Sequence, residues 1–154
     1  MDGLSIFKYQ EEIECLKAQC GFDFVGVALV QSAARHFELR WEFVTGNQSD
    51  RYRRIVLQTG KGVAGHVFKT GKPFLVEDVE EKLGEKNLFN YPIVVSEGLK
   101  SFGAIPLYKY NWVKGVLLIG YRDGKKLTPQ EFDEFKEVIG SRFGPFYNRE
   151  KVKD

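Results

Sequence analysis

The segment TGKGVAGHVF, residues 59–68, has the residue types and spacing of a small anion site. Gly60 and Gly62 let the backbone turn sharply, and the apolar residues after them have helical spacing up to Gly71. A helix that begins at Val63 leaves its first N–H groups without helical acceptors and has about half a positive charge at that end. No Asp, Ser or Thr directly precedes Val63 as a cap. The segment therefore predicts an anion site, with plain fold punctuation as the alternative.

Trp41 is the second candidate donor. Residues 35–44, RHFELRWEFV, alternate apolar and polar side chains, which predicts a half-buried strand. An inward-facing indole needs an acceptor for its N–H group and offers no acceptor of its own. A ligand with only acceptor atoms would suit it, although a carbonyl group of the core would serve as well. The apolar face of this strand is predicted to hold Phe37, Leu39, Trp41 and Phe43.

The composition argues against several classes of protein. A chain of 154 residues with 43% hydrophobic residues fits one globular domain. A formal net charge of +2 is too small to indicate a nucleic-acid-binding protein. No apolar run approaches the ~20 residues of a membrane span, and the N-terminus lacks the pattern of a signal peptide. We therefore expect a cytoplasmic protein that binds neither nucleic acid nor membrane.

The order of apolar patterns predicts an α+β fold with a central antiparallel sheet of about five or six strands. The whole chain, 1–154, is expected to form a single domain. A capping box of Thr128 and Glu131 marks the start of the last helix, whereas the pattern of 80–99 is mixed. The expected elements are an N-terminal helix at 3–20, a core at 22–125 with strands at 22–30, 35–44, 54–58, 73–79, 100–110 and 114–122 and a helix at 63–70, and a C-terminal helix at 128–150.

Two segments resemble the GAF domain family. They are GKGVAGHVFKTGKPFLVEDV, residues 60–79, and GLKSFGAIPLYKYNWVKGVLLIGY, residues 98–121. They are similar to that family's glycine-rich turn into a helix and to its closing hairpin, and the likeness covers roughly 15–145. The resemblance implies the GAF fold. It leaves the ligand open, because GAF domains bind cyclic nucleotides, bilins, haem, amino acids or small anions, and some bind nothing.

Within this family, the chain is most similar to free-standing cytoplasmic GAF proteins that serve as nitrate receptors for a sensor histidine kinase of a two-component system. The closer match is carried by Trp41, the run Gly62-Val63-Ala64-Gly65, and NYPIVV at 90–95. The resemblance implies nitrate as the ligand and no cofactor. It also implies hydrogen bonds from the backbone N–H groups of Val63 and Ala64 and from the Trp41 indole, with Tyr91 and Ile93 enclosing a small, mostly apolar pocket.

Other functions remain as alternatives. Some GAF proteins of this length resemble free methionine-R-sulfoxide reductases, which need cysteines near the pocket, yet Cys15 and Cys20 both fall in the N-terminal helix. His36 and His66 show no catalytic or metal-ligand spacing with other residues, so we expect neither catalysis nor a metal site. A pocket for another small ligand such as a cyclic nucleotide, or a ligand-free interaction module, is also consistent with the sequence.

A signal must leave such a domain through a surface that another protein contacts. The terminal helices at 3–20 and 128–150 are the expected surfaces for a sensor kinase or for a homodimer. The segment 80–99 is the expected moving part. Nitrate would have to bind one conformation better than the other, because equal affinity shifts nothing.

Overall fold

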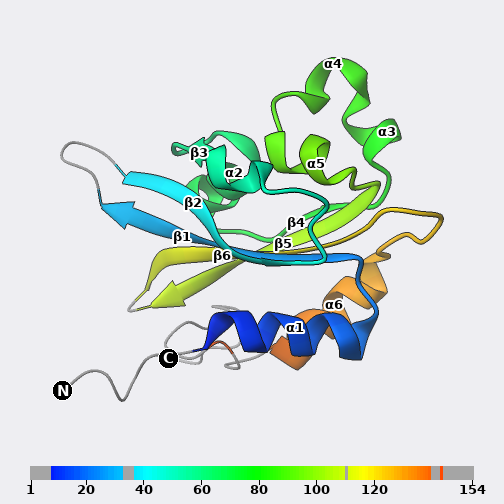
Figure 1. The fold of residues 1–154 in the computed structure, drawn as a ribbon, viewed down its shortest axis with the longest axis horizontal. Coiled ribbons are helices and arrows are strands. Elements are labelled where there is room, and N and C mark those ends of the chain that lie inside the picture. Colours follow the sequence, from blue (N-terminus) through cyan, green and yellow to red (C-terminus); the bar gives the residue numbers. More distant parts are fainter. Residues whose placement is uncertain (1–7, 33–36, 110, 140–142, 144–154) are drawn as a thin grey trace.

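The computed structural model describes residues 8–32, 37–109, 111–139 and 143. Its strands form one sheet of six, in the order β3-β2-β1-β6-β5-β4, and every pairing is antiparallel (Figure 1). This confirms the α+β class and the central antiparallel sheet. The strands are β1 Phe24–Ser32, β2 Phe37–Thr45, β3 Val56–Leu57, β4 Phe74–Val76, β5 Ser101–Lys109 and β6 Trp112–Tyr121. The helices are α1 Tyr9–Cys20, the 3-10 helix η2 Arg51–Arg54, α2 Gly62–Thr70, α3 Val79–Lys82, α4 Gly84–Leu88, α5 Pro92–Glu97 and α6 Pro129–Ile139.

The sheet separates two helical layers, with α1 and α6 below one face and α2 to α5 above the other (Figure 1). Each face has its own apolar cluster. The lower cluster joins Ile13 and Leu16 of α1 to Phe132 and Phe135 of α6. The upper cluster, which we call the cap cluster, contains Phe24, Ala28, Leu39, Trp41, Val63, Ala64, Val67, Ile93, Val94 and Phe102, with Tyr91 packed against it. Alternation along β1 explains the division, because Phe24 and Ala28 face upward while Val25 and Val27 face downward.

The predicted face of β2 is right for Leu39 and Trp41 and wrong for Phe43. The pairing with β1 shifts between Val27 opposite Phe43 and Ala28 opposite Trp41, which leaves Glu42 as an extra residue. Such a β-bulge interrupts the two-residue period. Phe43 therefore packs with the lower cluster and stacks on Tyr9 at 5.1 Å between ring centroids. The side chain of Phe37 lies outside the described part of the chain.

Both terminal helices are present, with bounds that differ from the prediction. The first begins at Tyr9, and residues 3–7 of the predicted range lie outside the described residues. The last helix has the predicted capping box, in which Glu131 N–H donates to Thr128 Oγ1 at 3.1 Å and Thr128 N–H donates to Glu131 Oε1 at 3.3 Å. Beyond Ile139, the predicted range to 150 falls mostly outside the described residues. Among the described residues no helix has the length and apolar character needed to cross a membrane.

Candidate functional site

The start of α2 is buried and has no side-chain cap. Lys61 occupies the N-cap position with extended backbone angles, φ −107° and ψ 133°, and its side chain accepts no hydrogen bond. The Lys61 carbonyl accepts from Gly65 N–H at 3.0 Å, which closes the first helical turn. The N–H groups of Val63 and Ala64 find no acceptor within the described residues, and both residues are fully buried. Within the described residues, two buried backbone donors therefore lack an acceptor at the positive end of a helix.

Glycines shape this turn through their backbone angles and through close packing. Gly62 has φ +68°, which confirms the expected sharp turn. A side chain at Gly62 would meet Leu57 Cδ1 and Cδ2 at 2.9 Å. The missing side chain thus makes room for Leu57. At Gly65 an added Cβ would collide with the Gln58 carbonyl oxygen, because the loop before the helix lies against it and Gly60 N–H donates to Gly65 O at 2.8 Å.

Trp41 adds a third unpaired donor on the same side of the sheet. Its side chain is 3% exposed, and its indole Nε1–H has no acceptor within the described residues. Small neighbours on β1 make room for the ring: Ala28 lies opposite Trp41, and a Cβ at Gly26 would come within 3.3 Å of Trp41 Cε3. Leaving a buried donor unpaired costs about 1–3 kcal/mol, so this indole is unusual in a well-packed core.

Tyr91 and Ile93 lie at the start of α5, where Pro92 takes the first helical position. Ile93 is 1% exposed and belongs to the cap cluster, while Tyr91 is half-buried and packs against it. The ring of Tyr91 lies 6.3 Å from that of Phe74. The structure therefore places all five predicted residues, Trp41, Val63, Ala64, Tyr91 and Ile93, in one cluster, and their contact with a ligand stays a prediction.

A buried ion pair fixes the far end of α5 and was not foreseen from the sequence. Glu97 is fully buried, and its Oε1 lies 2.7 Å from Arg122 Nη2 and accepts the Gln48 N–H at 2.7 Å. Arg122 also donates to the Glu97 carbonyl at 2.7 Å and to the Gly46 carbonyl at 2.9 Å. Burial raises the pKa of the Glu97 carboxyl, although the Gln48 N–H and the Arg122 charge oppose that shift. In the sequence, Glu97 and Arg122 each follow an apolar segment. This pattern does not indicate that the two residues pair.

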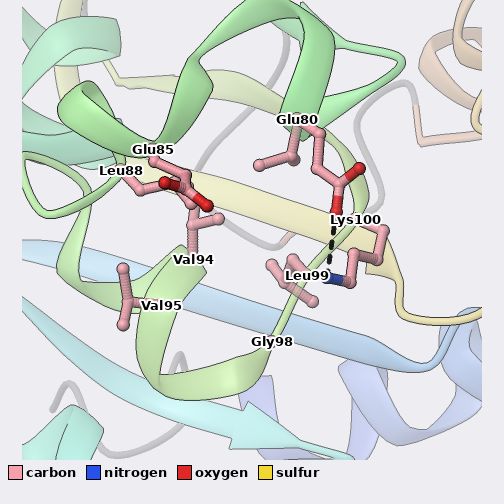
Figure 2. A pocket seen from close by; sticks show the side chains of 9 residues that line it. Glu80, Glu85, Leu88, Val94, Val95, Gly98, Leu99 and Lys100 are labelled. Carbon is pink, nitrogen blue, oxygen red and sulfur yellow. Dashed lines mark ion pairs between the residues drawn. The ribbon is translucent and has the colours of Figure 1, made fainter.

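A separate cavity of about 520 Å³ lies among α3, α4 and α5 (Figure 2). Val94 and Leu99 form part of its apolar lining, and Lys100 Nζ pairs with Glu80 Oε2 at 3.8 Å on its rim. Glu85 also faces it. None of the five predicted residues lines this cavity. Two carboxylates border this cavity, and their charges disfavour a small anion there.

Both cysteines lie on α1, beneath the opposite face of the sheet (Figure 1). Cys15 is exposed, and Cys20 packs against the lower cluster. The sheet therefore separates both thiols of the chain from the cap cluster. A cysteine-dependent reaction at the candidate site would have no thiol within reach in this conformation.

Comparison with solved structures decides the family. A structure of NreA from Staphylococcus aureus, mutated in its nitrate binding site, is 38% identical to this chain, with a TM-score of 0.74. The match covers 78% of this chain and 87% of the NreA chain. The chain belongs to the NreA family. No protein-family model matches the sequence, and no curated protein does.

More distant structures share the fold with this member of the NreA family. The GAF domain region of a putative membrane protein from Geobacter sulfurreducens PCA is 18% identical, with a TM-score of 0.69 over 88% of this chain and 87% of that chain. A type II free methionine-R-sulfoxide reductase from Thermoplasma acidophilum is 16% identical, with a TM-score of 0.65 over 86% of this chain and 84% of that chain. These likenesses show the GAF fold alone, and the resemblance to that family is confirmed at the level of the fold.

Proposed function

We propose that this protein is a cytoplasmic nitrate receptor that binds nitrate in the cap cluster and modulates a sensor histidine kinase. The nitrate oxygens would accept hydrogen bonds from the N–H groups of Val63 and Ala64 and from the Trp41 indole. Tyr91 and Ile93 would enclose the ion. The likeness to NreA supports this proposal, since NreA has a nitrate binding site.

The unpaired Trp41 indole is the observation that carries the proposal. A core tryptophan with a structural role normally donates to a carbonyl oxygen, and this one does not within the described residues. Val63 and Ala64 add two more donors in the same cluster. A ligand that matches three donors must offer acceptors only, and nitrate has three acceptor oxygens and no hydrogen. Water could accept from one donor, but it would then have to find acceptors for its own two hydrogens.

Charge and enclosure favour a monoanion over a phosphate. The helix end contributes roughly 0.3–2 kcal/mol, and each hydrogen bond to a charged group about 1.5–3 kcal/mol. Even millimolar binding needs about 4 kcal/mol, so the three donors together are of the required magnitude. These donors are all neutral groups, which can balance one dispersed negative charge more readily than the two charges of phosphate. The apolar side chain of Ile93 also favours a weakly hydrated ion, because such an ion loses less hydration free energy when it is buried.

Calorimetric titration with nitrate tests the binding step. The wild-type protein should bind nitrate, and Trp41→Phe, which keeps an apolar ring but removes the N–H donor, should bind at least about tenfold more weakly. Trp112→Phe is the matched control, because Trp112 is 71% exposed and is not one of the five proposed site residues. This variant should bind nitrate as the wild type does. Unchanged affinity in Trp41→Phe, or no heat with nitrate, would refute the proposed site. Cyclic GMP and methionine sulfoxide, titrated in parallel, distinguish a nitrate site from a nucleotide pocket and from a reductase.

Modulation of a kinase is the further part of the proposal. It is tested by autophosphorylation of a purified sensor histidine kinase in the presence of this protein, with and without nitrate. Nitrate should change the kinase rate with wild-type protein and leave it unchanged with Trp41→Phe. An identical nitrate effect with both proteins would show that the ion acts elsewhere, while the binding step would stand on its own titration.

A further inference from the structure

A groove of about 470 Å³ lies between the C-terminal end of α2 and the β5–β6 hairpin, and none of the five proposed nitrate-site residues is among its lining residues. We call it the hairpin groove. Its volume lies within the range of pockets that hold ligands or anchor side chains, roughly 300–1,000 Å³. Its lining residues are Val30, Thr59, Phe68, Lys69, Thr70, Gly71, Tyr108, Asn111, Trp112, Val113 and Lys114.

The apolar part of the groove is built around an exposed tryptophan. Trp112 is 71% exposed at the start of β6, and Phe68 and Val30 are half-buried beside it at the edge of the cap cluster. An indole exposed to water lacks the hydrophobic stabilisation that its burial would give. Tryptophan is also the residue type most enriched among side chains that dominate binding energies at protein interfaces. The arrangement is therefore typical of a surface that a partner covers.

The walls of the groove are held in place before anything binds. Tyr108 Oη donates to the Gly71 carbonyl at 2.8 Å, which ties β5 to the end of α2. Gly71 N–H in turn donates to Val67 O at 2.8 Å and ends the helix. A Cβ at Gly71 would come within 2.7 Å of Tyr108 Oη, so this close approach requires glycine. A preformed groove loses less entropy when a ligand binds than a mobile surface does.

The charge of the lining indicates what kind of occupant fits the groove. Lys69 and Lys114 are both exposed at the rim, and no Asp or Glu is among the described residues that line the groove. The cavity of Figure 2, by contrast, has Glu80 and Glu85 beside its one lysine. Two ammonium groups beside an exposed indole favour carboxylates next to an apolar or aromatic side chain. That combination is the chemistry of an acidic peptide with one large apolar anchor.

We propose that the hairpin groove docks an acidic peptide segment of a partner protein. The anchor side chain lies against Trp112 and Phe68, and flanking carboxylates lie beside Lys69 and Lys114. The last turn of α2, with Phe68 and Lys69, lines the groove, so an occupant contacts the helix whose N-terminal end holds the free N–H groups. The docking itself does not require that nitrate bind the protein.

Selection from a phage-displayed library of random linear peptides tests this directly on the full chain. Peptides retained by the wild-type protein and released by Trp112→Ala should be rich in Asp and Glu around one Phe, Trp or Leu. The most enriched peptide, made synthetically, should bind the wild type in fluorescence anisotropy and lose at least about tenfold in affinity with Trp112→Ala. Enrichment of neutral or basic peptides, or no enrichment that depends on Trp112, overturns the proposal.

The role of the two groove lysines is tested by reversing their charge and comparing the result with the same change elsewhere on the surface. Lys69→Glu with Lys114→Glu should abolish binding of that peptide, and binding to the wild type should weaken as salt is raised. Lys82→Glu with Lys86→Glu changes the net charge equally on the exposed faces of α3 and α4 and should leave the affinity unchanged. Equal losses in both double variants would show a general charge effect and overturn the proposal. Sedimentation at rising concentration tests a second copy as the occupant, and self-association that Trp112→Ala abolishes would also overturn it.

Discussion

The N-termini of α2 and α6 differ in what their free N–H groups donate to. The first turn of α6 is exposed, and Thr128 and Glu131 satisfy its free N–H groups with their own side chains. The first turn of α2 is fully buried at Val63 and Ala64, where water cannot reach freely, and it has no cap. A buried helix end without acceptors is the less stable arrangement. The difference indicates that side chains stabilise the start of α6, whereas the start of α2 leaves two buried donors without an acceptor within the described residues.

The largest expected effect comes from breaking the backbone turn that starts α2. Gly62→Ala should lower the free energy of unfolding by about 3 kcal/mol, because it combines a left-handed backbone with a contact to Leu57. Gly84→Ala is the matched control: Gly84 also begins a helix with φ +71° but has open space around it. It should cost only about 1–2 kcal/mol. Urea unfolding measures both, and equal losses would mean that packing against Leu57 does not fix the turn.

Giving α2 the cap that α6 already has sharpens the comparison. Lys61→Ser places a hydroxyl at an N-cap with extended backbone angles, within reach of the first-turn N–H groups. Relative to Lys61→Ala, which also removes the charge, it should raise the free energy of unfolding by about 1 kcal/mol. The same hydroxyl competes with nitrate for its donors, so affinity should fall several-fold below that of Lys61→Ala. Calorimetry that finds equal nitrate affinity in the two variants would contradict the use of these donors.

Removing the cap from α6 should affect stability alone. Thr128→Ala should lower the free energy of unfolding by about 1 kcal/mol, since Glu131 N–H loses its acceptor. The nitrate affinity should stay at the wild-type value, because α6 covers the other face of the sheet (Figure 1). Thermal unfolding and titration of the same preparation measure both quantities. A loss of nitrate affinity here would show that the two faces are coupled.

Local patterns were enough to predict the strands, the uncapped start of α2 and the inward position of Trp41. They failed where pairing between distant segments decides the structure. The bulge at Glu42 depends on the register with β1, and no feature of β2 alone reports it. It is also the reason that Phe43 leaves the face that Trp41 occupies.

The anchoring of α5 was equally beyond local patterns. Glu97 and Arg122 are 25 positions apart, and their ion pair forms only because β6 returns beside the end of α5. The mixed pattern of 80–99 did not give the bounds of the three short helices α3, α4 and α5, each of which is too short to be stable without tertiary contacts. Sequence could therefore identify candidate donors at the site, but not the supports that hold the site together.

The smallest expected effect concerns the motion of α5. Its C-terminal end is held by the Glu97–Arg122 pair, whereas its N-terminal end, at Tyr91, borders the proposed nitrate site. Nitrate should therefore slow amide hydrogen exchange at the start of α2 and around Tyr91 and Ile93, and change it less at Glu97. The exchange of α6 should not change. Hydrogen exchange measured by mass spectrometry with and without nitrate tests this gradient. Unchanged protection across 80–99 would exclude that segment as the moving part, because a region that transmits the ligand must differ between the two states.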